Sequence, residues 1–61
     1  MNTIEMSVQL MVQNRDIQWL CNLENEFAER IARWENLKEN INLQLLISES
    51  RRLVTNLLIN N

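Results

Sequence analysis

The stretch IQWLCNLENEFAERIARWENLKENINLQL, residues 17–45, carries the strongest pattern in the chain. A large apolar residue recurs every seven positions, and the neighbouring heptad position holds further apolar side chains. The first line is Leu20, Phe27, Trp34 and Ile41, and the second line includes Ile17, Ile31 and Leu45. Such a 3.5-residue repeat is typical of a helix that packs lengthwise on a partner helix. We call these two lines the seam, and we expect it to be an oligomer interface.

The size of the chain favours assembly. Its 61 residues allow a single small helical domain, 1–61, and a lone chain of this length buries too little surface to be more than marginally stable. One Cys and no His leave neither an intrachain disulfide nor a zinc site as a staple. The absence of Gly and Pro suits long helices and disfavours tight hairpins between strands. We therefore expect a homo-oligomer, a dimer or higher.

Charge and hydropathy exclude several partners and sites. The net charge of −2 with scattered basic residues is not that of a nucleic-acid binder. No apolar run has the length of a membrane span and no signal-peptide pattern is present, which predicts a cytoplasmic protein without a membrane partner. The shortness and the abundance of Asn and Ile suggest a bacterial or phage source. We expect no enzyme, no catalytic residue, no cofactor and no metal, since Cys21 has no His to act as its base.

Residues 3–13, TIEMSVQLMVQ, allow two interpretations. Ile4, Val8, Met11 and Val12 follow helical spacing, and Asn2 with Glu5 has the spacing of a capping box. The whole stretch also alternates apolar and polar residues, broken only at Met11, as a half-buried strand does, and such a strand would need a mate from a second chain. A helix is the favoured interpretation. A break at residues 14–16 is expected mainly if a strand precedes it, with Asn14 or Asp16 as the helix cap.

A second break is predicted near Asn40 and Asn42, two residues that tolerate left-handed backbone. After them the apolar stripe changes phase, so a single straight helix could not keep both stripes against one partner. The resulting fold class is all-α. A long helix over about 16–39 and a second over about 43–59 form a hairpin, which assembles as a dimeric helical bundle.

Two charged residues, Glu24 and Lys38, interrupt the seam. They lie seven residues either side of Ile31, so in an antiparallel dimer Glu24 of one chain would face Lys38 of the other. A polar residue at such a heptad position fixes register at some cost in stability. We expect this pair to set the register of the oligomer, unless both side chains bend out of the seam.

A second apolar line lies off the seam and could dock another protein, because Trp is enriched in binding hot spots. The alternative is that it packs inside the chain's own fold. The line comprises Val8, Val12, Trp19 and Leu23.

Function is expected to be binding. The leading interpretation is a protein–protein interaction module, a small homo-oligomeric regulator, adaptor or inhibitor that offers a helical face to a larger protein. If residues 4–12 form a strand, the order strand, helix, helix resembles the ribbon-helix-helix family, which implies a dimeric DNA-binding regulator. A small secretion-type chaperone that sequesters a partner's helix is a third possibility.

Overall fold

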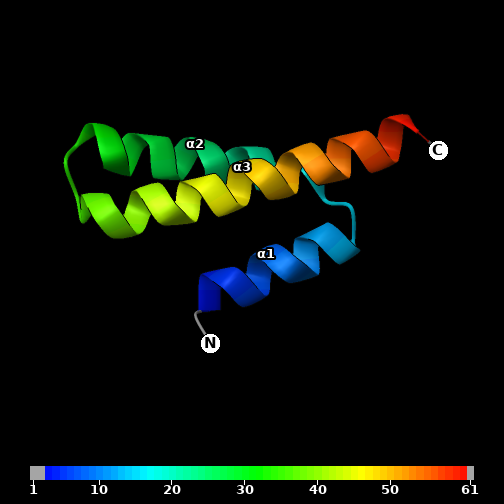
Figure 1. Cartoon of the computed structure of the whole chain (residues 1–61), viewed down its shortest axis with the longest axis horizontal. Coiled ribbons are helices and arrows are strands. Elements are labelled where there is room, and N and C mark those ends of the chain that lie inside the picture. Colours follow the sequence, from blue (N-terminus) through cyan, green and yellow to red (C-terminus); the bar gives the residue numbers. More distant parts are fainter. Residues whose placement is uncertain (1–2, 61) are drawn as a thin grey trace.

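The fold consists of three helices joined by two short turns. A computed structural model describes residues 3–60, and in it α1 spans Thr3–Gln13, α2 spans Ile17–Ala32 and α3 spans Leu37–Ile59 (Figure 1). No strand forms in this part of the chain. The prediction of an all-α chain is confirmed, as is the helical interpretation of residues 3–13. The strand alternative is wrong, and the ribbon-helix-helix resemblance loses the strand on which it depended. The predicted cap at Asn2 lies outside the described residues.

The turn between α1 and α2 forms even though a helix precedes it, which the sequence did not favour. Arg15 adopts a left-handed backbone with φ of 54°, and its N–H donates to the Val12 carbonyl at 3.1 Å. The side chain of Asp16 accepts a hydrogen bond from the N–H of Trp19 at 3.1 Å, so Asp16 is the N-cap of α2. The physical reason for the break is burial, because only by folding back does α1 hide Val8, which is 1% exposed.

The turn between α2 and α3 lies at residues 33–36, and the predicted break at 40–42 is wrong. The predicted helices 16–39 and 43–59 are therefore corrected to Ile17–Ala32 and Leu37–Ile59. A hairpin turning about Ile41 would set Phe27 opposite Thr55. The observed turn instead places Phe27 in one core with Ile47. Apolar matching between the two helices thus decides where the chain reverses.

Asn40, which the sequence offered as a helix breaker, is a buried residue of α3 with 6% exposure. Its side-chain amide donates to the backbone carbonyl of Glu35 at 2.7 Å, and its N–H donates to the carbonyl of Asn36 at 2.9 Å. Both bonds satisfy carbonyls of the turn that precedes the helix. Asn40 therefore lies at the start of α3 and stabilises the interhelical turn before it, and it does not interrupt the helix.

Trp34 adopts a left-handed backbone in this turn, with φ of 60°, and its side chain is 80% exposed. Left-handed backbone costs a residue with a Cβ roughly 1–2 kcal/mol, and glycine avoids this cost. Glycine also loses more conformational entropy on folding, which cancels about 0.5–1 kcal/mol of the gain. We expect Trp34→Gly to raise the free energy of unfolding by about 0.5–1 kcal/mol in urea denaturation. Trp34→Ala keeps the Cβ and should leave stability near that of the natural chain. Equal stabilisation by both substitutions would contradict the backbone explanation.

The core lies where all three helices meet. Its five fully enclosed apolar residues come from each helix and are Val8, Leu20, Phe27, Ile47 and Val54. The hairpin of α2 and α3 forms one antiparallel layer, and α1 lies along the α3 side of it, parallel to α3 (Figure 1). The molecule is elongated, with principal dimensions of 39 × 23 × 14 Å. The last turns of α3 extend beyond the start of α2, where Leu58 and Ile59 are 47% and 74% exposed.

Candidate interaction surface

The structure divides the predicted seam between the interior and the surface. Leu20 and Phe27 are completely buried inside the chain's own core. They therefore do not face a second chain, and their assignment to an oligomer interface is corrected. Their heptad spacing reflects intrachain packing of α2 on α3, which follows the same rule as packing between chains.

The remaining seam residues lie at or near the surface. Ile17 and Ile31 of α2 are half-buried, and Ile17 packs against the core. Ile41 and Leu45 of α3 are 42% and 56% exposed. Trp34 lies in the turn rather than in a helix, so the continuous seam of the sequence is two separate helical stripes in space.

Glu24 is the polar centre of the α2–α3 hairpin. Arg51 donates from Nε to the Glu24 Oε1 at 2.8 Å, and the Ser48 hydroxyl donates to Oε2. The carboxylate and the guanidinium are 22% and 28% exposed, so the ion pair is shielded but not enclosed. We call Glu24, Ser48 and Arg51 the polar cluster. Since Glu24 finds its cation within its own chain and Lys38 is exposed, the predicted pairing of Glu24 with Lys38 of a second chain is replaced by this cluster.

The polar cluster holds Glu24 in its charged form. The hydrogen bond from Ser48 is the main cause that lowers the pKa of Glu24 below its ordinary 4.5; burial opposes it, and the hydrogen bond and charge of Arg51 add to the lowering. A depressed pKa in the folded state means that charged Glu24 stabilises the fold above the ordinary pKa. That contribution is lost as the pH falls through the lower pKa of the folded protein.

We therefore expect stability to decline with acid in part through Glu24. In urea titrations from neutral pH to about pH 3, the unfolding midpoint of the natural chain should fall more than that of Glu24→Gln, which has no charge to lose at this site. Glu26→Gln is the matched control, because Glu26 pairs with Arg30 on the exposed surface of a single helix. An acid response of Glu24→Gln identical to that of the natural chain would contradict this role.

The second apolar line lies inside the fold, which is the alternative that the sequence left open. Val8 belongs to the core, and Val12, Trp19 and Leu23 pack against it. These side chains fasten α1 to the hairpin. The expectation that this line docks another protein is therefore corrected.

Ser48 and Arg51 could not be recognised from the sequence as partners of Glu24, since they lie 24 and 27 residues away along the chain. Only the position of the α2–α3 turn brings them opposite Glu24. Both residues are polar, but the sequence could identify them as partners of Glu24 only once the position of the α2–α3 turn was known.

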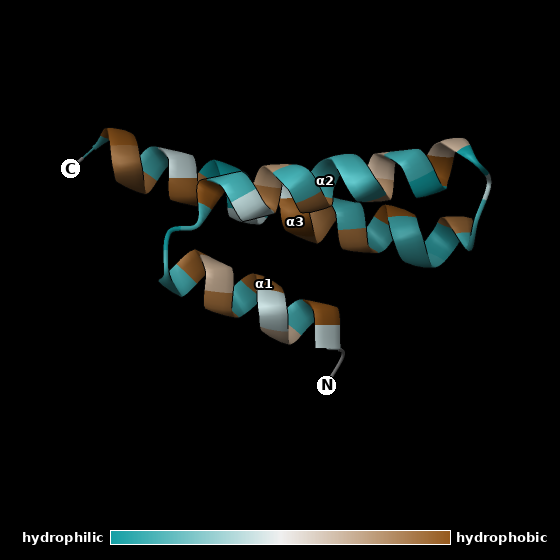
Figure 2. Ribbon diagram, turned by 180° about the vertical axis from the view of Figure 1, so that it is seen from behind, coloured by the Kyte–Doolittle hydropathy of each residue, from teal (hydrophilic) through white to brown (hydrophobic). Residues whose placement is uncertain are grey.

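Several apolar side chains are left on the outside of the folded chain. The large ones that are at least two-fifths exposed are Met6, Leu10, Trp34, Ile41, Leu45, Leu53, Leu58 and Ile59. Hydrophobic segments, drawn in brown, recur along all three helices (Figure 2). Among the residues that the structure describes, the exposed large apolar side chains outnumber the five enclosed apolar residues of the core. Residues 3–60 thus present more large apolar side chains than they fully enclose.

The described residues include a free thiol and a groove between two helices. Across residues 3–60, no three side chains of His, Cys, Asp or Glu gather in a way that could hold a metal ion. Cys21 is a free, half-buried thiol on α2. A groove between α1 and α3 is lined by residues of both helices, namely Glu5, Gln9, Asn42, Leu43 and Leu46.

None of the helices in the described part of the chain is long and apolar enough to cross a membrane. Comparison of the chain with protein-family models, with curated proteins and with solved structures finds no match.

Proposed function

We propose that this protein is a non-enzymatic protein–protein interaction module that works as a homo-oligomeric helical bundle. In this role it would serve as a small regulator, adaptor or inhibitor whose helical faces contact other proteins. Self-association is the first property to test, because the apolar surface that a larger partner would use is equally available to a second copy of the chain.

The exposed apolar side chains are the observation that supports this proposal. Single exposed hydrophobic residues are normal on a protein surface, whereas repeated ones along helix faces indicate contact with another protein. Within residues 3–60, eight large apolar residues are exposed against five that are fully enclosed. A chain of this size gains little stability from so small a core, and association would supply the missing burial.

A dimeric bundle fits the shape of the hairpin. An antiparallel pair of helices has a broad outer surface, and α1 lies only along the α3 side of the pair (Figure 1). Two hairpins that pack through their uncovered sides form a four-helix arrangement with short connections, which is a common architecture for helical assemblies.

The test is the molecular mass in solution. We expect sedimentation equilibrium of the purified chain to give at least twice the 7.3 kDa of one copy, with dissociation on dilution. A single species of 7.3 kDa over the micromolar range would contradict self-association. Helix content that stays constant while the oligomer dissociates would show that the chain folds alone and associates through its surface.

A further inference from the structure

We propose that the second copy docks on the side of the α2–α3 hairpin opposite α1, centred on the polar cluster and flanked by Ile41 and Leu45 of α3. This inference rests on the proposed self-association and assigns it to one of the surfaces that the fold leaves open. We call this side the open face.

Helical spacing places these residues on one face. Ile41, Leu45 and Arg52 are separated by four and seven residues, so they share one stripe of α3. Ser48 lies three residues after Leu45 and four before Arg52, and it contacts Glu24 of α2. The stripe therefore borders α2 on the side to which Glu24 points.

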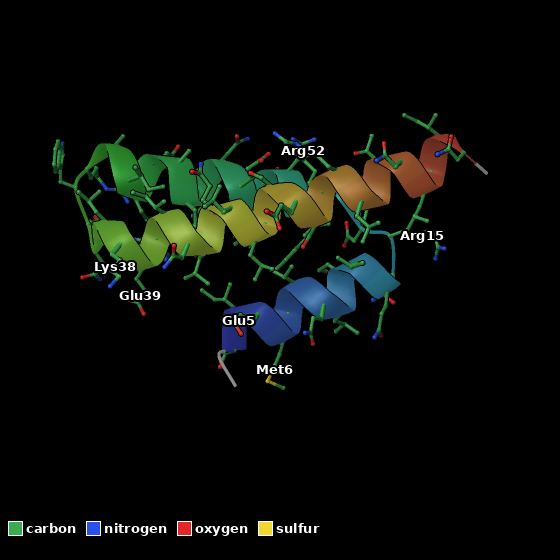
Figure 3. The ribbon with its side chains drawn as sticks, in the orientation of Figure 1. Glu5, Met6, Arg15, Lys38, Glu39 and Arg52 are labelled. Carbon is green, nitrogen blue, oxygen red and sulfur yellow. The ribbon has the colours of Figure 1, made fainter. Side chains whose placement is uncertain are left out.

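The opposite stripe of α3 belongs to α1. Leu43 and Leu46 line the groove against Glu5 and Gln9 of α1, and Leu53 lies seven residues after Leu46 on the same stripe. Figure 3 agrees with this division, since Arg52 projects on the side of the hairpin away from α1, while Met6 points outward from the far side of α1. The open face and α1 thus lie on different sides of the hairpin.

The polar cluster makes the open face suitable for burial. An unpaired charge at the centre of an interface would strongly oppose association, because it would lose its hydration without gaining a partner. Glu24 instead has both carboxylate oxygens occupied, one by Arg51 at 2.8 Å and the other by Ser48. A second copy can cover this pair without leaving the carboxylate unsatisfied, and the apolar residues around it supply the favourable burial.

The area matches what a dimer requires. Two adjacent helices are about 20 Å wide, and the 16 residues of α2 are about 24 Å long. The open face therefore measures about 500 Å² in projection, so a contact between two copies buries roughly 1,000 Å² in total, which is near the lower limit of specific interfaces. The competing outer face of α1 is one helix wide, and its exposed large apolar residues are Met6 and Leu10. A second copy also presents the same open face, which suits a two-fold symmetric contact.

Three leucines of similar exposure allow a matched test. Leu45 on the open face is 56% exposed, Leu53 on the α1 side of α3 is 50% exposed, and Leu10 on the outer face of α1 is 51% exposed. Each is replaced by Glu in the full chain, and the dissociation constant is measured by sedimentation equilibrium. Circular dichroism checks that each variant remains helical.

We expect Leu45→Glu to weaken association by about 100-fold or more, because a charge would be buried in both copies, while Leu53→Glu and Leu10→Glu change it by less than about threefold. Loss of the dimer in Leu10→Glu or Leu53→Glu with an intact dimer in Leu45→Glu would overturn the assignment to the open face. So would an intact dimer in all three variants, although the proposed function would stand. A natural chain that is monomeric overturns both proposals.

Discussion

Phe27→Ala should unfold most of the chain at room temperature. Phe27 is the largest of the fully buried side chains, and its ring lies in the core with residues from all three helices. Removing a buried Phe side chain costs about 3–5 kcal/mol, and a core in a chain this short rarely supplies more than about 3–5 kcal/mol in total. Loss of the far-UV helical signal, or a urea midpoint near zero, is the expected measurement.

Leu53→Ala provides the control for Phe27→Ala. Leu53 lies on α3 and is 50% exposed, so its truncation removes less buried surface. We expect a loss of roughly 1 kcal/mol or less and a cooperative transition like that of the natural chain. A Phe27→Ala variant with a midpoint equal to that of Leu53→Ala would contradict the placement of Phe27 at the centre of the core.

Val8→Asp should release α1 from the hairpin. Val8 is 1% exposed, and an ionised carboxylate at this position would have to be buried without a cation, which costs several kcal/mol. Undocked, α1 has 11 residues and is too short to remain helical alone, so we expect the loss of roughly a fifth of the helical signal. The hairpin keeps its own contacts through Leu20, Phe27, Ile47 and Val54.

Trp19 gives a second readout of the same event, since it packs against the core while Trp34 is 80% exposed. In a Trp34→Phe background, undocking of α1 should shift the emission of Trp19 to longer wavelength. Met6→Asp is the control, because Met6 lies on the outer side of the same helix and is 54% exposed. A red shift in both variants would show that α1 is held by something other than its Val8 face.

The sequence predicted which segments are helical better than it predicted the residues at which the helices begin and end. Helical spacing indicated the correct state for residues 3–13 and for the body of α2, and Asp16 has the cap role expected of an Asp before an apolar helix. The break at residues 14–16 was nevertheless expected mainly if a strand, and not a helix, preceded it. Local propensity says little about whether a helix should fold back, since the gain comes from Val8 meeting a core built by the other two helices.

The heptad pattern identified Leu20 and Phe27 as packing residues but not what they pack against. A periodic stripe reports that a partner helix exists, and it is the same whether that helix belongs to the same chain or to another. The line of Val8, Val12, Trp19 and Leu23 was ambiguous for the same reason. Its location in the fold became clear only when α1 was placed against α2 and α3.

The composition and the helical periodicity were enough to predict a helical chain, because both depend on local backbone preference and on the period of apolar residues. The tertiary structure alone decided that the hairpin turns at Trp34 and not at Asn40. The turn places left-handed backbone at Trp34, where it is locally unfavourable, as well as at Asn36, and local preference does not single out this Asn over Asn40 or Asn42. The choice is made by matching across the hairpin, which sets Phe27 in one core with Ile47 and brings Glu24 to Ser48 and Arg51.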